Sequence, residues 1–250
     1  MSQIISVHSF RGGTGKSNTT ANLAATFAAQ GMRVGVVDTD IQSPGIHIIF
    51  GMGDQRPPHS LNDYLNGDCR IEEAAMDMTP GLGVSLKGRV FLIPSSTQIS
   101  QITRFLKGYD VGVLVDGYEQ AIKMLNLDAL LIDTHPGLNN ETLMSVSVSD
   151  ALAVILRPDF QDYQGTAVIV DISRRLGVQN MVLVANKIPL NLHLDQLRTN
   201  LETQYRCPVG ALLPHSEEMM ALGSEGVFVL RYPNHPISAE IKRLAQMLLA

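Results

Sequence analysis

The chain has 250 residues, enough for one α/β domain with a large core, and we predict a single domain over residues 1–250. Nineteen Lys and Arg residues against 24 Asp and Glu residues give a net charge of −5, which argues against attraction of the whole surface to DNA or to an anionic membrane. No window approaches the roughly 18 unbroken apolar residues of a membrane span, and the N-terminus lacks the pattern of a secretory signal, so we predict a cytoplasmic protein.

Short apolar runs rich in β-branched residues recur along the chain, with helix-like segments between them. Because the runs are continuously apolar, they are typical of strands buried on both faces of a parallel sheet. The pattern predicts a doubly wound α/β fold, a mostly parallel sheet with helices on both faces. The predicted strands are residues 4–8, 34–38, 90–94, 129–133, 151–156, 181–186 and 209–214.

The segment from 51 to 89 interrupts this alternation. It contains Pro57, Pro58, Pro80 and several glycines, which break regular elements. We predict loop, short helices and loop at the periphery of the sheet.

The first predicted strand runs directly into "SFRGGTGKSN", residues 9–18, and a predicted helix follows at once. A strand, a glycine-rich turn ending in GKS and a helix form the context of a phosphate-binding P-loop. Phe10 occupies the position of the first glycine of the general pattern. The remaining glycines still let backbone N–H groups face a phosphate at the positive end of the helix. The predicted phosphate-binding residues are Gly12, Gly13, Thr14, Gly15, Lys16, Ser17 and Asn18.

Three of these residues have specific predicted roles. We expect Lys16 to bridge the β and γ phosphates of a nucleotide and Asn18 to contact the α phosphate. The hydroxyl of Ser17 is the expected ligand of a Mg²⁺ ion.

Carboxylates end two of the predicted strands: Asp38 and Asp40 in "VVDTD", and Asp133 in "ALLIDTHPG". A lone aspartate at such a place is as often a helix or turn cap. Three of them beside a P-loop favour a site for Mg²⁺, which keeps several of its waters when it binds phosphate.

In this order, "RGGTGKSN", "VVDTD" and "LLIDTHPG" resemble the deviant Walker A ATPases of the MinD/ParA family, many of which also lack a glycine at the position of Phe10. The resemblance covers nearly the whole chain in motif order. It implies a P-loop NTPase that binds ATP and Mg²⁺, forms a homodimer when ATP is bound, and separates on hydrolysis. It also implies slow turnover, an activating partner protein, and a role in positioning the division site, DNA or a large protein cargo.

The resemblance assigns roles to residues beyond the loop. Asp40 matches the aspartate that positions or activates the attacking water, and Asp38 and Asp133 match residues around Mg²⁺ and its waters. Residues 134–137 match the switch that senses the γ phosphate. On the base side, Asn186 of "VANK" matches an adenine contact, and Pro214 matches the loop that flanks the base.

Arg11 departs from the family, whose members mostly carry a lysine that reaches across the dimer to the partner's phosphates. Arginine keeps the positive charge, and its planar guanidinium group can form two parallel hydrogen bonds to a phosphate. Arg11 is therefore a catalytic candidate together with Lys16 and Asp40. Arg157 is a second candidate for the contact across the dimer. Its alternative role is a salt bridge to Asp159 or Asp162.

The C-terminal segment "ISAEIKRLAQMLLA" predicts an amphipathic helix. Its apolar face favours packing in the core, with a membrane-facing role as the alternative. Association with a membrane or with nucleoid DNA stays open. The residues of this face are Ile237, Ile241, Leu244, Leu248 and Leu249.

Other classes of protein contain the same kind of glycine-rich phosphate-binding loop. A metal-cluster enzyme or carrier needs suitably placed cysteines, and Cys69 and Cys207 show no ligand spacing, so we interpret them as reduced thiols. A bacterial tyrosine kinase of the same superfamily ends in a tyrosine cluster, which the last 18 residues lack. A nucleotide-binding scaffold that recruits partners in its ATP state and hardly hydrolyses ATP is the main alternative.

Overall fold

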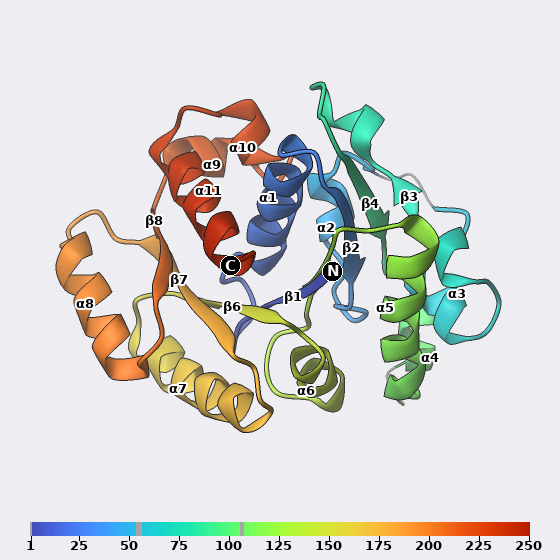
Figure 1. Cartoon of the computed structure of the whole chain (residues 1–250), viewed down its shortest axis with the longest axis horizontal. Helices are drawn as coiled ribbons and strands as arrows, with labels where there is room; N and C mark the ends of the chain where they lie inside the picture. The colour runs from blue at the N-terminus through green and yellow to red at the C-terminus, as the bar shows by residue number, and fades with distance from the viewer. Residues whose placement is uncertain (1, 54–56, 106–107) are drawn as a thin grey trace.

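The computed structural model describes residues 2–53, 57–105 and 108–250, and these form one sheet of eight strands in the order β3-β4-β2-β5-β1-β6-β7-β8 (Figure 1). Neighbouring strands are parallel except for β3 and β4. The strands are β1 (Gln3–His8), β2 (Arg33–Asp38), β3 (Met76–Asp77), β4 (Arg89–Ile93), β5 (Ala129–Asp133), β6 (Ala151–Leu156), β7 (Asn180–Ile188) and β8 (Val209–Pro214).

Helices cover both faces of the sheet (Figure 1). On one face α1, α2, α10 and α11 enclose a large apolar cluster, and on the other face α5 and α3 pack at one end and α7 and α8 at the other. The helices are α1 (Lys16–Ala29), α2 (Ile46–Ile49), α3 (Leu61–Leu65), α4 (Ile99–Phe105), α5 (Val111–Leu125), α6 (Asn140–Ser147), α7 (Phe160–Arg175), α8 (Leu194–Tyr205), α9 (Glu217–Leu222), α10 (Phe228–Arg231) and α11 (Pro236–Leu248), with 3₁₀ turns η1 (Ile71–Glu73) and η2 (Thr79–Leu82).

The predicted fold is confirmed, and each of the seven predicted strands is present to within about two residues at its ends. The prediction for residues 51–89 is also confirmed where the structure describes them; 54–56 lie outside the described residues. The exception is β3, a two-residue antiparallel strand in which Met76 lies opposite Leu92. Two residues are too short to show a period, so the sequence could not reveal it.

The parallel register brings the carboxyl ends of the central strands together. Asp133 of β5 lies beside Asp38 of β2 on one side and beside Val7 of β1 on the other. The glycine-rich loop therefore leaves β1 at the same edge of the sheet as the two buried aspartates, where ligands bind in open α/β sheets.

Helix α11 buries its apolar face against β8 and α1. Ile237, Ile241, Leu244 and Leu248 are each at most 3% exposed, and Leu249 is partly buried in the same cluster. The core-packing interpretation of this helix is confirmed, so its apolar face is not available to a membrane. Of the helices in the described ranges, none has the length and apolar character needed to cross a bilayer.

Candidate nucleotide-binding site

The glycine-rich loop presents a row of unpaired backbone donors. Gly13 and Gly15 adopt positive φ angles of 73° and 101°, and α1 begins directly after Gly15 without a side-chain cap. Within the described part of the chain, no backbone N–H from Gly12 to Asn18 donates a hydrogen bond to the protein. Uncapped donors at a helix N-terminus are typical of anion sites, so the loop has the geometry that its predicted role requires.

Phe10 has a structural role in place of the glycine of the general motif. A Cβ atom at Gly165 of α7 would lie 2.1 Å from the Phe10 ring, so this ring rests directly on the backbone of α7. Phe10 therefore anchors the start of the loop to α7.

Lys16 lies at the floor of the site with two buried aspartates. The exposed fractions are 7% for Lys16, 0% for Asp38 and 1% for Asp133. Burial raises the pKa of Asp133 to about 6, opposed by hydrogen bonding from Ser17 and by the charge of Lys16, and burial together with the charge of Asp133 raises the pKa of Asp38. Burial lowers the pKa of Lys16, and the three nearby aspartates oppose that shift.

This acidic cluster fits a Mg²⁺ ion with its water shell. Asp38 Oδ2 is buried and has no hydrogen-bond partner among the described residues, whereas its other oxygen accepts a hydrogen bond from the Asp40 backbone N–H at 3.0 Å. Two adjacent buried carboxylates need a cation or donors between them. Ser17, Asp38 and Asp133 are therefore the residues that would hold the ion and its waters.

Asp40 lies at the rim of the site, beside the segment predicted to be a switch. Its Oδ1 accepts a hydrogen bond from the Ser43 backbone N–H at 3.1 Å and lies 3.7 Å from His135 Nε2. Burial raises the pKa of Asp40, and the neighbouring His135 and Lys16 oppose the shift. The carboxylate of Asp40 is 17% exposed, so it remains accessible to water.

His8 connects the end of β1 to that switch segment. Its Nδ1 lies 2.7 Å from Thr134 Oγ1, which donates to the Val7 carbonyl at 3.0 Å. Burial lowers the pKa of His8 to about 3, so the ring is neutral at physiological pH. His8 is accordingly a buried structural neighbour of the site, whereas His135 lies at its rim beside Asp40.

A cleft of about 730 Å³, within the usual size range of small-molecule sites, opens above the loop. It brings together most of the predicted ligand-binding residues, whereas Thr14, Asp38 and Asp133 lie buried beneath it. The predicted residues that line the cleft are Gly12, Gly13, Gly15, Lys16, Ser17, Asn18, Asp40, Asn186 and Pro214.

The cleft also contains residues that sequence analysis missed. Lys187 follows Asn186 directly, while Met219 and Met220 come from α9, beyond the Pro214 loop. The sequence signal for Lys187 was its place in "VANK". No motif marks the two methionines.

Asn18 is oriented by a second asparagine that the sequence analysis did not identify. Asn22, one turn along α1 and fully buried, donates from Nδ2 to Asn18 Oδ1 at 2.8 Å. Asn22 Oδ1 accepts the Val229 backbone N–H of α10 at 2.8 Å, which fixes the orientation of the Asn22 amide. The Asn18 amide nitrogen consequently remains available as a donor.

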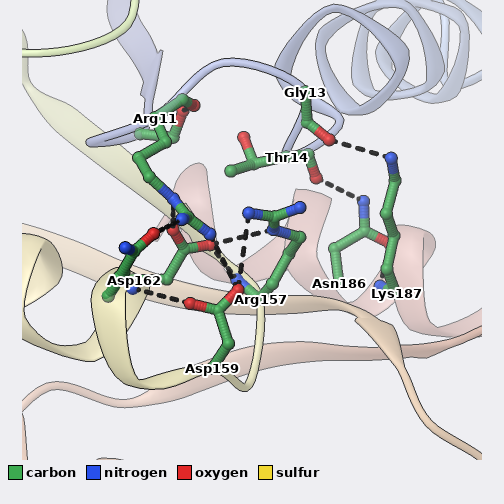
Figure 2. A network of polar contacts seen from close by, with 10 residues as sticks. Arg11, Gly13, Thr14, Arg157, Asp159, Asp162, Asn186 and Lys187 are labelled. Carbon is green, nitrogen blue, oxygen red and sulfur yellow. Dashed lines mark hydrogen bonds and ion pairs between the residues drawn. The ribbon is translucent and has the colours of Figure 1, made fainter.

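Arg11 and Arg157 share one carboxylate cluster at the start of α7 (Figure 2). Arg11 Nε donates to Asp162 Oδ1 at 2.5 Å and Arg11 Nη2 to Asp159 Oδ2 at 2.8 Å, with a further contact to Gln161. Arg157 Nε donates to Asp162 Oδ2 at 3.2 Å, and its Nη2 lies 3.4 Å from Asp159 Oδ2. The salt-bridge interpretation of Arg157 is confirmed, and Arg11 is held by the same two aspartates.

We expect Asp162→Asn to lower the free energy of unfolding by about 1–3 kcal/mol, because Asp162 is 2% exposed and accepts charged hydrogen bonds from both arginines. Urea denaturation measures this change. Asp171→Asn is the matched control, because its pair with Arg175 lies on the exposed face of α7 and contributes little. Equal stability of the two variants would mean that the cluster does not hold the start of α7.

The fold and this loop define a P-loop nucleotide-binding protein. A family model described as ParA, NUBPL iron-transfer P-loop NTPase, matches residues 1–249, so the chain belongs to this family. An uncharacterized ATP-binding protein of Methanocaldococcus jannaschii is 27% identical over 252 residues, covering 100% of this chain and 88% of that protein. The cytosolic Fe–S cluster assembly factor CFD1 of Yarrowia lipolytica is 32% identical over 149 residues, 60% of this chain and 46% of that protein.

A solved structure shows the same fold. The septum site-determining protein MinD of Pyrococcus horikoshii, in complex with Mg-ADP, superposes with a TM-score of 0.80 at 20% identity, covering 98% of this chain and 95% of that chain.

Proposed function

We propose that the protein is a Mg²⁺-dependent ATPase that dimerises when ATP is bound and uses this cycle to position a partner or cargo in the cell. The observation that carries the proposal is the row of unpaired N–H groups from Gly12 to Asn18 above the buried cluster of Lys16, Asp38 and Asp133. Backbone donors and a lysine above acidic metal ligands match the demands of a Mg-bound nucleoside triphosphate.

The chain's own residues supply positioning and charge. Lys16 neutralises charge that develops on the transferred phosphoryl group, and Asp40, half-buried at the rim, orients the attacking water. A bound Mg²⁺ ion supplies further neutralisation at the phosphate oxygens. Asn186 and Pro214 also line the cleft and are the proposed adenine contacts.

Arg11 is the proposed contact across the dimer, and the structure adds a condition to that role. Because Asp159 and Asp162 hold its guanidinium within the same chain, Arg11 must leave these partners before it reaches a second nucleotide. Its side chain is 28% exposed, so the exchange does not require the core to open.

Wild-type protein with Mg-ATP is expected to double its mass in light scattering, and with Mg-ADP to remain monomeric. Asp40→Ala should keep the ATP-bound dimer from dissociating, because the attacking water loses its orienting carboxylate. An unchanged mass with ATP, or normal cycling of Asp40→Ala, would contradict the proposal. A dimer that forms with ATP but hardly hydrolyses it, even with a cognate activator, would favour a recruiting scaffold.

A second candidate function is iron transfer for cluster assembly, which the description of the family model and the similarity to CFD1 favour. In the described ranges, neither cysteine belongs to a group of three or more His, Cys, Asp or Glu side chains that could hold a metal ion, and Cys207 is buried in the core. Anaerobic incubation with iron and sulfide, followed by visible absorbance, separates the two functions. A stoichiometric chromophore that Cys69→Ser removes would favour transfer.

A further inference from the structure

Two side chains near the end of β7 hold the phosphate loop by its backbone carbonyl groups (Figure 2). Lys187 Nζ donates to the Gly13 carbonyl at 2.8 Å, and Asn186 Nδ2 donates to the Thr14 carbonyl at 2.8 Å. These carbonyls belong to consecutive peptide units in the middle of the loop. The Asn186–Thr14 pair is 172 positions apart in the sequence, and the Lys187–Gly13 pair is 174 positions apart. Both pairs meet at the part of the loop that is proposed to face the phosphates.

Peptide geometry gives these contacts a consequence for the other side of the loop. In a planar trans peptide the C=O group and the following N–H group point in opposite directions. When Lys187 holds the Gly13 carbonyl, the Thr14 N–H points away from Lys187. When Asn186 holds the Thr14 carbonyl, the Gly15 N–H points away from Asn186. Both N–H groups belong to the row that has no acceptor among the described residues.

The backbone of β7 is distorted where the two side chains emerge. Lys187 has a φ of 53°, uncommon for a residue with a side chain, and the pairing of β7 with β8 shifts register between Asn186 and Ile188. A conformation of this kind persists where the surrounding contacts determine it.

The orientation of the Asn186 amide follows from its own neighbour. The Lys187 backbone N–H donates to Asn186 Oδ1 at 2.8 Å, which turns Nδ2 toward the Thr14 carbonyl. The contact is close, because a Cβ atom at Gly15 would lie 2.3 Å from Asn186 Nδ2. Gly15 thus combines a positive φ with the room that Asn186 needs.

We infer that Asn186 and Lys187 form a clamp that holds the nucleotide-free loop in its phosphate-binding conformation, and that Lys187 is a positioning residue for the phosphates. The inference rests on the proposed function, because it assigns these residues to the same nucleotide site. Donors fixed before the ligand arrives need no reorganisation on binding, which strengthens their interaction with phosphate.

Lys187→Met tests the clamp, because it keeps the length of an exposed side chain and removes the donor. Calorimetry with Mg²⁺ measures the affinities for ADP and for inorganic pyrophosphate. We expect both to weaken by the same factor, about tenfold, the scale of one charged hydrogen bond. Lys123→Met, an exposed lysine on α5, is the matched control and should bind both probes like wild type. Lys187→Arg, which restores a charged donor, should regain part of the lost affinity.

The amide spectrum of the nucleotide-free protein gives a readout that does not depend on a bound nucleotide. We expect the Thr14 and Gly15 N–H signals to broaden in Lys187→Met, because the loop then exchanges between orientations. Unchanged signals with weaker binding would overturn the clamp in favour of simple charge attraction.

Different results would refute the nucleotide-binding function and the clamp. Wild-type protein that binds neither ADP nor ATP would refute the nucleotide function itself. Wild-type protein that binds ADP, with Lys187→Met binding ADP and pyrophosphate equally well, would refute only the clamp. Weaker ADP binding with unchanged pyrophosphate binding would also refute it, because Lys187 would then act on the base side.

Discussion

Lys16→Ala is expected to abolish ATP-dependent dimerisation and hydrolysis. Among the positively charged residues of the loop, Lys16 is the one that is buried beside Asp38 and Asp133. No other positive side chain of the loop can therefore replace it at the phosphates. Light scattering with and without Mg-ATP measures pairing, and phosphate release measures turnover. Both signals should fall to background.

Two further measurements keep this result interpretable. Removing the ammonium group leaves two buried carboxylates without their cation, so the free energy of unfolding must be compared with wild type. Lys16→Met keeps most of the packing volume and should lose pairing in the same way. A folded Lys16→Ala protein that still dimerises with ATP would contradict the assignment of the loop.

Arg11→Ala is expected to retain ATP binding near the wild-type level but to lose hydrolysis within the dimer by about a thousandfold, the scale of an arginine supplied in trans. The cleft above the loop is lined by other residues, so the nucleotide's own contacts in the same chain remain. Nucleotide binding by calorimetry and single-turnover hydrolysis separate the two effects.

Arg157→Ala is the matched control, because Arg157 pairs with the same Asp159 and Asp162. Both variants remove one arginine from the cluster, so a general loosening of α7 would affect them equally. If Arg157→Ala loses as much turnover as Arg11→Ala, or if Arg11→Ala turns over like wild type, then Arg11 is not the trans residue.

The sequence predicted those parts of the molecule that depend on local pattern. Continuous apolar runs marked the seven parallel strands, and spacing within residues 9–18 marked the loop, because both are read within about ten neighbouring residues. The carboxyl-edge position of Asp38 and Asp133 also followed, since parallel strands align their ends.

The contacts that bind the site together were not predictable in the same way. The sequence suggested Asp159 and Asp162 as partners of Arg157, a few residues away, but not of Arg11, about 150 positions earlier. That pairing arises because β1 lies beside β6 in the sheet, which brings the loop after β1 to the start of α7. The hydrogen bond from Lys187 to the Gly13 carbonyl likewise depends on a register shift between β7 and β8, which no local sequence pattern encodes.

The contact between Phe10 and Gly165 links the sizes of the side chains that fit at these two positions. A side chain at Gly165 collides with the Phe10 ring, so a larger residue at 165 is compatible only with a smaller one at 10. Among homologous chains we expect these positions to change as a pair, with either the aromatic ring on the loop or a side chain on α7 filling one shared volume.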